Sequence, residues 1–214
     1  MTSTLDDARV RGVLENMHTT ADRNDPPILA KAKGKSDTER AALLGEAFIP
    51  VDRHAGRLLY TLARSSAPGT IVEFGTSFGI STIYLAAAVR DRGEGIVITT
   101  ELHAGKAERA REYLREAGLF DLVDLREGDA LETLKNVEAD VSVVFLDGWK
   151  PLYLPVLRML EPALQPGALV VADDLDLFPD ALKPYLDYVR DPAHGYVSAT
   201  VPVGDALELS TRAR

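Results

Sequence analysis

Three aspartates of this 214-residue chain follow directly on apolar runs, in a pattern that could bind a cation. Asp147 follows the run at 141–146, and the pair Asp173-Asp174 follows the run at 168–172. Such runs are typical of buried strands in a parallel sheet, whose carboxyl ends meet at one edge. Neighbouring carboxylates repel one another, and a divalent cation with oxygen ligands removes that repulsion. The sequence therefore predicts a metal site for Mg²⁺ first, with Mn²⁺ or Ca²⁺ as alternatives.

Lys150 follows Asp147 by three residues, in the sequence Asp-Gly-Trp-Lys. A lysine can accept a proton only when it is neutral, and a nearby dication lowers the pKa of a lysine from its usual value of about 10.4. In that state Lys150 could take the proton of an acceptor hydroxyl. The simpler alternatives are an ion pair between Lys150 and Asp147, and helix-capping roles for the aspartates.

A small-residue turn after another apolar run predicts a nucleotide-like cofactor. The run at 71–74 suits a buried strand, and the apolar residues after Gly79 recur every three or four positions, as on a helix face. Gly75 and Gly79 allow positive φ and a close approach of backbone to ligand, while the helix N-terminus directs amides at it. Ser77 replaces the central glycine of a dinucleotide fingerprint, which disfavours a dehydrogenase.

Acidic residues around this turn indicate which cofactor it holds. Glu73 precedes Gly75, where a carboxylate would repel a pyrophosphate but suits a cation. S-adenosylmethionine carries an ammonium, a sulfonium and a carboxylate, so Glu73, backbone amides and the Ser81 hydroxyl could hold its methionine part. Glu101 ends a second apolar run and could accept hydrogen bonds from both ribose hydroxyls. Asp129 follows a third run, near the expected adenine amino group; a helix-end charge and an ordinary N-cap are the alternatives for these two acids.

The composition narrows the functional classes. A formal net charge of −9 disfavours binding to nucleic acid or to an anionic membrane, because both need a basic face. The absence of cysteine excludes disulfides, thiolate metal sites and a cysteine nucleophile. No apolar run is long enough to span a membrane, and no secretory signal is apparent. We therefore expect a small-molecule partner, no nucleic acid, no membrane and a cytoplasmic location.

The elements that would position these residues form one α/β domain. Strands and helices alternate after residue 70, which is typical of a mostly parallel sheet with helices on both faces. The expected strands are 71–74, 95–100, 122–126, 141–146 and 168–172, with a terminal pair at 196–201 and 206–210. The expected helices between them are 80–88, 104–117, 129–136, 151–160 and 179–190.

The chain before the first strand predicts further helices at 5–18, 37–48 and 52–65. A loop is expected at 19–36, because this segment contains Asp-Pro-Pro and a run of lysine and glycine. Residues 1–49 are interpreted as a helical cover over the cofactor edge, and residues 50–214 as the core of a single domain. The histidines His18, His54, His103 and His194 show no ligand spacing and are expected at the surface or at helix ends.

Together the motifs resemble the cation-dependent O-methyltransferases of the catechol and caffeoyl-coenzyme A type. The resemblance extends from about Ile49 to the C-terminus and rests on VEFGTSFGIS, TTEL, GDALETL, DGWKPLY followed by ADD, and the tail VPVGDALEL. It implies a Rossmann-like class I methyltransferase fold, with a seven-stranded mostly parallel sheet, an antiparallel C-terminal strand and extra N-terminal helices. It also implies methyl transfer from S-adenosylmethionine to a hydroxyl of a small aromatic, catechol-like or phenolic acceptor, assisted by a divalent metal.

The resemblance assigns roles residue by residue. The implied cofactor-binding residues are Ile49, Val51, Glu73, Gly75, Thr76, Ser77, Ser81, Glu101, Leu102, Asp129, Ala130, Asp147 and Trp149. Asp147, Asp173 and Asp174 match the metal ligands, Lys150 matches the general base next to Asp147, and Tyr153 joins Lys150 on the acceptor side. One position departs from the family, because Asp174 stands where asparagine is common. Bacterial relatives of this type also suggest a homodimer.

Two other functions stay open on the sequence. In a metal-independent methyltransferase of the same fold, Asp173 and Asp174 would be structural, and activity would survive treatment with a chelator. A nonenzymatic S-adenosylmethionine-binding protein would bind the cofactor without methylating any phenol or catechol. Asp147 together with Lys150 speaks against this second alternative.

Overall fold

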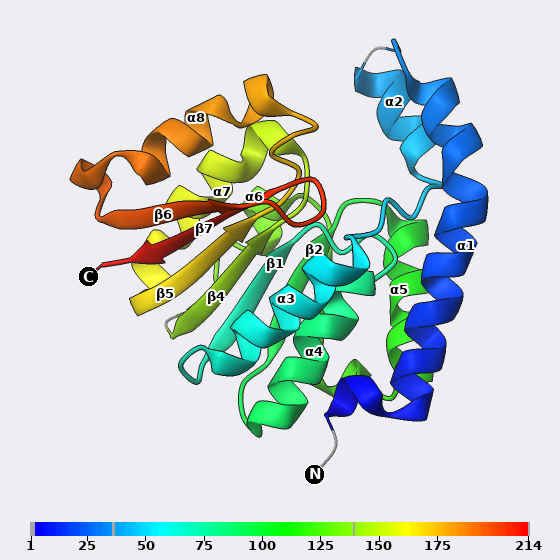
Figure 1. Ribbon diagram of the computed structural model, residues 1–214, viewed down its shortest axis with the longest axis horizontal. Coiled ribbons are helices and arrows are strands. Elements are labelled where there is room, and N and C mark those ends of the chain that lie inside the picture. Colours follow the sequence, from blue (N-terminus) through cyan, green and yellow to red (C-terminus); the bar gives the residue numbers. More distant parts are fainter. Residues whose placement is uncertain (1–2, 36, 139, 214) are drawn as a thin grey trace.

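A seven-stranded sheet with the strand order β3-β2-β1-β4-β5-β7-β6 organises the molecule (Figure 1). This computed structural model describes residues 3–35, 37–138 and 140–213. The strands are β1 (Thr70–Phe74), β2 (Val97–Glu101), β3 (Val123–Glu127), β4 (Val141–Leu146), β5 (Leu164–Ala172), β6 (Tyr196–Val201) and β7 (Leu207–Arg212). Strands β1 to β5 pair in parallel, whereas β7 is antiparallel to both β5 and β6. The expected mostly parallel sheet with an antiparallel C-terminal strand is thus confirmed.

Eight α-helices surround the sheet in the described part of the chain. They are α1 (Ala8–Ala32), α2 (Asp37–Leu44), α3 (Arg53–Ser65), α4 (Ile80–Arg92), α5 (Ala104–Ala117), α6 (Ala130–Thr133), α7 (Tyr153–Leu160) and α8 (Pro179–Arg190). Short 3-10 turns occur at Thr4–Asp6, Phe120–Leu122, Lys150–Leu152, Glu161–Ala163 and Pro192–His194. Most expected elements after residue 52 are found within a few residues of their predicted bounds.

The helices divide the hydrophobic core between the two faces of the sheet. Helices α1, α3, α4 and α5 pack on one face, and α6, α7 and α8 pack on the other. Successive side chains of β1 point to opposite faces: Ile71 packs in the core on the α4 side, and Val72 packs in the core on the α7 side. All six residues of β4 are buried, as expected for a valine-rich strand that is covered on both faces.

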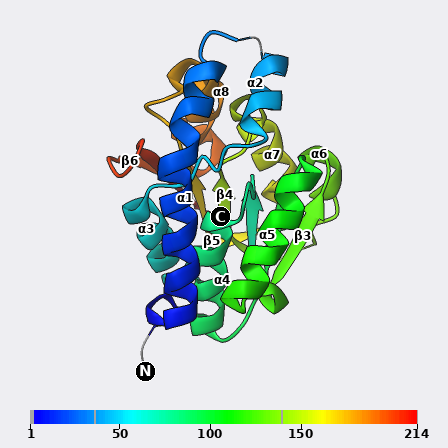
Figure 2. The same cartoon turned by 90° about the vertical axis from the view of Figure 1, so that its right-hand side faces the viewer.

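The predicted loop at 19–36 is wrong for most of its length. Helix α1 continues to Ala32 and includes Pro26 and Pro27, as the long helix beside α5 in Figure 2 shows. The reason is its buried face, which runs on past the predicted end through Ala21 and Asp25. Tertiary packing on one side of the helix therefore outweighs the two prolines. Ser36, the last residue of that predicted loop, lies outside the described residues.

His18 also differs from the expectation of a surface or helix-end position. It lies within α1 with 3% of its surface exposed, because it belongs to the helix face that packs inward. His54, His103 and His194 are exposed, as expected. None of the helices that the structure describes is both long and apolar enough to cross a bilayer.

The strand order reverses between β1 and β4, and this point marks the expected ligand-binding edge of the sheet. From β1 the chain adds β2 and β3 on one side of the sheet. It then crosses back and adds β4 and β5 on the other side of β1. Ligands of open α/β sheets bind beyond the carboxyl ends of the strands at such a reversal. The residues that follow β1, β2, β4 and β5 are therefore brought to one edge.

Candidate functional site

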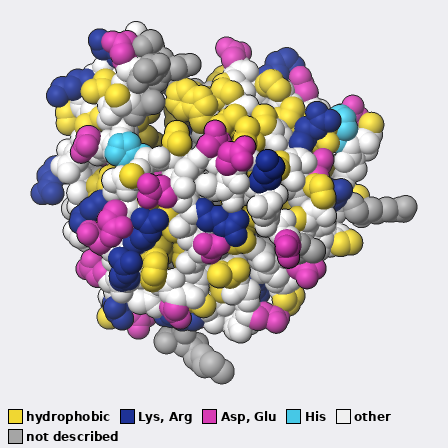
Figure 3. Space-filling view, turned by 180° about the vertical axis from the view of Figure 1, so that it is seen from behind, with side chains coloured by type: hydrophobic (Ala, Val, Ile, Leu, Met, Phe, Trp, Pro, Cys, Tyr) yellow, Lys and Arg dark blue, Asp and Glu magenta, His cyan; other side chains and the backbone are white. Residues whose placement is uncertain are grey.

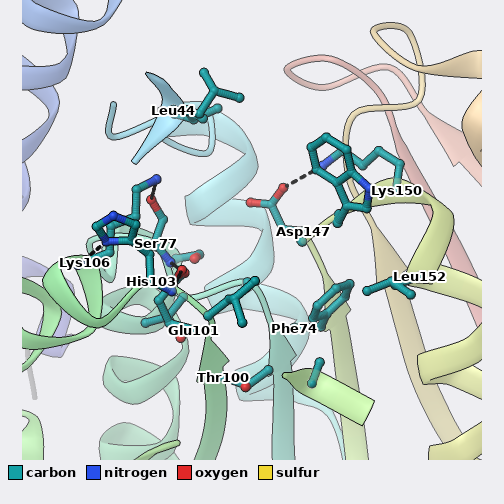
Figure 4. Close-up of a pocket in the computed structure, with 18 of the residues that line it drawn as sticks. Leu44, Phe74, Ser77, Thr100, Glu101, His103, Lys106, Asp147, Lys150 and Leu152 are labelled. Atoms are coloured by element: carbon teal, nitrogen blue, oxygen red, sulfur yellow. Dashed lines mark hydrogen bonds and ion pairs between the residues drawn. The ribbon is translucent and has the colours of Figure 1, made fainter. Parts of the chain in front are cut away.

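A cavity of about 740 Å³ opens at the carboxyl ends of β1, β2 and β4. On the face seen in Figure 3, hydrophobic side chains gather around a hollow beside the end of the molecule that carries α2. Figure 4 shows the arrangement inside: Ser77, Glu101 and Lys106 lie on one side, and Asp147 and Lys150 lie on the other. The cavity therefore joins the two constellations that the sequence singled out.

The residues predicted to bind a cofactor line this cavity, with one exception. Those in the lining are Ile49, Val51, Gly75, Thr76, Ser77, Ser81, Glu101, Leu102, Asp129, Ala130, Asp147 and Trp149. The exception is Glu73, which is fully buried and does not belong to the lining. Binding by these residues stays a prediction, but their convergence on one cavity is a property of the fold.

The turn after β1 holds the two sides of the cavity together. Gly75 has φ +103°, and a Cβ at this position would lie 2.7 Å from the carbonyl carbon and oxygen of Asp147. Such a separation is shorter than any normal contact, so only glycine fits without a shift of backbone. Gly79, with φ +91°, then begins α4. The turn is thus held against the strand end that carries Asp147.

Glu101 is fixed by two backbone donors at the end of β2. Its Oε2 accepts a hydrogen bond from Ser77 N at 2.8 Å, and its Oε1 accepts one from His103 N at 2.9 Å. Each carboxylate oxygen has a further acceptor site, which leaves capacity for hydroxyl donors in the cavity. This arrangement fits the two hydroxyls of a ribose.

Glu73 lies beneath the turn rather than in the cavity. Its Oε2 accepts hydrogen bonds from Thr82 Oγ1 at 2.5 Å and from Thr99 Oγ1 at 2.6 Å, and Thr99 Oγ1 lies 2.6 Å from Thr76 Oγ1. Its Oε1 is buried without a hydrogen-bond partner, and burial raises the pKa of the carboxyl. Glu73 therefore supports the turn from below, through threonines on α4 and β2.

Asp129 and Ala130, two of the residues predicted to contact adenine, follow the end of β3. Asp129 caps α6, because its side chain accepts a hydrogen bond from Leu131 N at 2.9 Å. This is the N-cap alternative, and Asp129 also lines the cavity next to Ala130. Trp149 lines it from the other side and is 38% exposed.

The three predicted metal ligands meet at the ends of β4 and β5. One carboxylate oxygen from each of Asp147, Asp173 and Asp174 lies within 4.8 Å of the others. Ca²⁺ binds oxygen at about 2.4 Å and Mg²⁺ at about 2.1 Å, so oxygens on opposite sides of one ion are about 4–5 Å apart. Three such oxygens therefore fit a single divalent cation.

Backbone geometry brings the third aspartate to this point. Asp174 has φ +70°, in the left-handed region that aspartate and asparagine tolerate better than other non-glycine residues. Its N–H donates to Asp173 Oδ1 at 2.7 Å. The same tolerance explains in physical terms why asparagine and aspartate can both occupy this position.

Lys150 lies between the carboxylates. Its Nζ is 2.5 Å from Asp174 Oδ2 and 3.4 Å from Asp147 Oδ1, so the ion pair that the sequence left as an alternative is present. Its ammonium also lies 5.2 Å from the centre of the Tyr153 ring and 5.6 Å from that of Phe178. In this arrangement the lysine compensates part of the negative charge of the cluster.

Burial and like charge shift the proton affinities of the cluster. Burial raises the pKa of Asp147 well above its usual value, and Lys150 acts in the opposite direction. Burial together with the Asp174 charge raises the pKa of Asp173 to about 7. Burial alone would lower the pKa of Lys150, but Asp147 and Asp174 outweigh it and raise this pKa. The carboxylates therefore favour positive charge, whether from protons, lysine or metal.

Tyr153 supports the cluster from below. Its side chain is fully buried and its hydroxyl donates to the carbonyl oxygen of Asp173 at 3.3 Å. It is absent from the lining of the cavity, so the structure does not bring it to the acceptor side where the resemblance put it.

A smaller cavity of about 320 Å³ lies on the other side of the carboxylates. Asp147 and Asp174 line both cavities, whereas Asp173 lines the smaller one. Its wall also contains Asp25, whose carboxylate accepts hydrogen bonds from Phe48 N at 3.0 Å and Ile49 N at 2.7 Å. Helix α1 thus fixes the segment that borders both cavities.

Sequence reasoning missed several residues of the site. The most notable is Lys106 in the first turn of α5, which lines the larger cavity although only 7% of its surface is exposed. His103 lines the same cavity and caps α5, its Nδ1 accepting from Lys106 N at 3.3 Å. Nothing in the residue types of this charged helix distinguished Lys106 from its solvent-exposed neighbours.

Comparisons with known proteins show which proteins this chain is similar to. The model of the family described as "Methyltransferase domain" matches residues 72–175. The chain is 34% identical to the catechol O-methyltransferase of Mycobacterium tuberculosis over 71% of its own length and 66% of the relative's. It is 31% identical to that of Niastella koreensis, over 64% and 63% of the two lengths. The chain thus matches less than two thirds of each of these relatives.

A solved structure extends the likeness to most of the chain. The O-methyltransferase TomG from Streptomyces achromogenes, involved in tomaymycin synthesis and crystallised with SAM, superposes with a TM-score of 0.69 at 25% identity. The superposition covers 84% of this chain and 91% of that one. With the strand order described above, the fold is that of a class I methyltransferase. The methyltransferase-domain match, the catechol O-methyltransferase relatives and the shared fold together support the predicted resemblance to the cation-dependent O-methyltransferases.

Proposed function

We propose that this protein transfers a methyl group from S-adenosylmethionine to a hydroxyl of a small aromatic acceptor of the catechol or phenol type, with a divalent cation. The observation that carries the proposal is the shared cavity: the glycine turn and Glu101 line one side of it, and the Asp147 carboxylate and Lys150 line the other. Methyl transfer requires a donor and an acceptor oxygen to meet in one place, and this cavity offers a site for each.

The cofactor side assigns each part of S-adenosylmethionine to residues of the lining. Glu101 would bind the ribose hydroxyls, because both of its oxygens are held in place by backbone amides. The methionine part would lie along Gly75, Ser81 and the segment at 49–51. Glu73 would act only indirectly, by fixing the turn through Thr82 and Thr99.

The cation would be held by Asp147, Asp173 and Asp174, whose oxygens are spaced for one ion. When bound, such a cation supplies Lewis acidity that favours ionisation of an acceptor hydroxyl and fixes its orientation. Mg²⁺ is the first candidate, with Mn²⁺ and Ca²⁺ as alternatives, since all three prefer oxygen ligands. A cation bound there would lie at the edge of the larger cavity, because Asp147 and Asp174 line it.

Lys150 is the proposed general base. It lies next to the Asp147 and Asp174 carboxylates and lines the cavity, so it can reach a hydroxyl held there. Positive charge bound by the aspartates compensates the carboxylates that raise its pKa, which favours the neutral amine. As the new carbon–oxygen bond forms and the carbon–sulfur bond breaks, the electron pair stays on sulfur and Lys150 takes the hydroxyl proton.

The aromatic class of the acceptor has support from side chains beside Lys150. Trp149 and Phe178 line the cavity on this side, together with Leu152 and Pro151. Aromatic and aliphatic walls with a few polar groups are typical of pockets for small aromatic ligands. The names of the catechol O-methyltransferase relatives support the same class.

Residues that precede the sheet would cover this cavity. Leu44, Gly45 and Phe48 line it at the end of α2 and in the following segment. We propose that residues 42–49 exclude water from it; in contrast, the first half of α1 packs in the core. A Leu44→Ser variant should raise the acceptor KM with little change in stability, and an unchanged KM would argue against a covering role.

One observation favours a metal-independent reaction as a second candidate. The Lys150 ammonium already lies 2.5 Å from Asp174, so the cluster has an internal cation. In that case Asp173 and Asp174 would serve structure, and lysine would stay protonated.

Methyl transfer before and after metal removal tests the proposal. The purified protein is dialysed against a chelator, supplied with S-adenosylmethionine and a panel of catechols and phenols, and assayed with and without added Mg²⁺. We expect activity only with the added cation. Activity that persists in chelator would favour the metal-independent candidate, and cofactor binding without transfer to any panel member would contradict an enzymatic role.

A further inference from the structure

Lys106 is a buried cation in the cofactor cavity that the proposed chemistry does not use. Its Nζ donates to Ser77 Oγ at 3.2 Å and lies 5.4 Å from the centre of the Phe78 ring. No carboxylate among the described side chains is in ion-pairing contact with it. A buried ammonium with a single neutral acceptor is unfavourable unless another partner supplies negative charge or hydrogen bonds.

The two lysines of the described cavity lining differ in this respect. Lys150 is held by the carboxylates of Asp147 and Asp174 on one side of the cavity. Lys106 lies on the opposite side, and Figure 4 shows its side chain beside Ser77 and away from that cluster. An anionic group of a ligand in this cavity would therefore find its free cationic partner at Lys106.

The surroundings of Lys106 indicate which part of the ligand it would meet. Ser77 Oγ, its hydrogen-bond partner, donates in turn to the carbonyl oxygen of Phe48 at 2.8 Å. The ammonium thus lies where the glycine turn meets the segment at 48–51. These two segments are the ones to which the proposed function assigns the methionine part of the cofactor.

We propose that Lys106 binds the carboxylate of the methionine part of S-adenosylmethionine. This inference rests on the proposed function, since it concerns how the same cofactor is held. Burial lowers the pKa of Lys106, although Glu101 acts to raise it, and a bound carboxylate would favour the charged form. With the ribose at Glu101, as proposed above, the carboxylate of the ligand would lie at the first turn of α5.

A pair of cofactor analogues tests this contact by calorimetry. S-adenosylhomocysteine keeps the carboxylate, whereas decarboxylated S-adenosylhomocysteine lacks this group and retains the rest. Hydrogen bonds to charged groups are among the stronger ones, so Lys106→Met should weaken binding of S-adenosylhomocysteine about ten- to one-hundredfold. Binding of the decarboxylated analogue should change less than about twofold, since its affinity contains no such contact.

Two further variants control for charge and for local structure. Lys106→Arg keeps the positive charge and should retain most of the preference for the carboxylate-bearing ligand. Lys183→Met removes an equal charge from the exposed face of α8, where Lys183 pairs with Asp187 at 2.7 Å, and should change neither affinity. Circular dichroism and thermal unfolding establish that each variant is folded.

The outcomes separate this inference from the function on which it rests. If Lys106→Met weakens both analogues equally, the lysine only supports the Ser77 turn and the inference is overturned. If neither affinity changes, Lys106 does not contact the cofactor, and the inference is again overturned while the proposed function stands. Wild-type protein that binds neither analogue would overturn the proposed function itself.

Discussion

The acidic residues on the two sides of the cavity have different surroundings. On the β1–β2 side, Glu101 is held by hydrogen bonds from two backbone N–H groups. On the β4–β5 side, Asp147, Asp173 and Asp174 crowd together with one lysine between them. The same edge of the sheet therefore offers a hydrogen-bond acceptor on one side and, on the other, a cluster of acids spaced for one cation.

This contrast would allow one fold to bind two ligands of different charge. A carboxylate that accepts two backbone hydrogen bonds is stable without a counterion and can bind neutral hydroxyls. Carboxylates that face one another favour protons or cations, as the raised pKa values of Asp147 and Asp173 indicate. Gly75 joins the two sides, because its backbone packs directly against that of Asp147.

The largest expected effect comes from the carboxylate side. Lys150→Ala should lower turnover by about 10²-fold or more, the usual scale of general-base catalysis, while the affinity for S-adenosylhomocysteine stays unchanged. Lys150→Arg is the matched control, because arginine keeps the ion pair but cannot accept a proton near neutral pH. Equal activity of the arginine variant and the wild type would reduce Lys150 to an electrostatic role.

The complementary change on the other side should affect binding rather than turnover. Glu101→Gln places an amide N–H₂ near Ser77 N or His103 N, so one backbone hydrogen bond is lost and ribose binding weakens. We expect the affinity for S-adenosylhomocysteine to fall about tenfold or more, measured by calorimetry. Glu127→Gln is the control, since Glu127 is the register partner of Glu101 on β3 but does not line the cavity. If Glu127→Gln lowered the affinity for S-adenosylhomocysteine as much as Glu101→Gln, the effect would not be specific to the cavity, and the contrast between its two sides would fail.

The carboxylate side should also make the metal-free protein sensitive to pH. The folded-state pKa of Asp173 is about 7, against an ordinary value of 3.8, so the folded protein binds more protons than the unfolded chain between these values. The stability that this group contributes is fully present below pH 3.8 and is lost as the pH rises through about 7.

Thermal unfolding at several pH values measures this effect. Where the folded and unfolded states differ by one bound proton, the free energy of unfolding changes by about 1.4 kcal/mol per pH unit. We expect the metal-free wild type to lose stability between pH 5.5 and pH 7.5, and Asp173→Asn to reduce that slope. Added Mg²⁺ should stabilise the protein more at the higher pH, because the proton and the cation compete. A slope that Asp173→Asn leaves intact would assign the pH dependence to other groups.

The smallest effect is expected for Asp174→Asn. Asparagine keeps an oxygen donor and tolerates the left-handed backbone at φ +70°, but it loses the charge that pairs with Lys150. Turnover at saturating Mg²⁺ should stay within about tenfold of the wild type, a change of about 1.4 kcal/mol at most. A loss comparable to that of Lys150→Ala would show that the charge, and not the oxygen, is required here.

The sequence predicted the sheet and its edge well because these depend on local patterns. The apolar run at 141–146 and the periodic helix at 104–117 were found within their predicted bounds. The convergence of Asp147, Asp173 and Asp174 followed from the rule that parallel strands end at one edge. These inferences needed no knowledge of long-range packing.

Other features depended on contacts that the sequence does not display. Glu73 shares the face of Ile71 in β1 and therefore points toward α4, but a strand buried on both faces does not reveal this from its residue types. Helix α1 continues through two prolines because distant elements cover its inner face. Lys106 lines the cavity because of how α5 packs, although the sequence predicts this helix only as a charged amphipathic one.

Titration with Mn²⁺, followed by electron paramagnetic resonance with and without S-adenosylhomocysteine, tests most directly whether these aspartates share one cation beside the cofactor. The wild type should bind one Mn²⁺ per chain, and Asp147→Ala and Asp173→Ala should each weaken this binding strongly, whereas Glu127→Gln should not. Unaltered Mn²⁺ binding in the two alanine variants, or no binding by the wild type, would contradict the account.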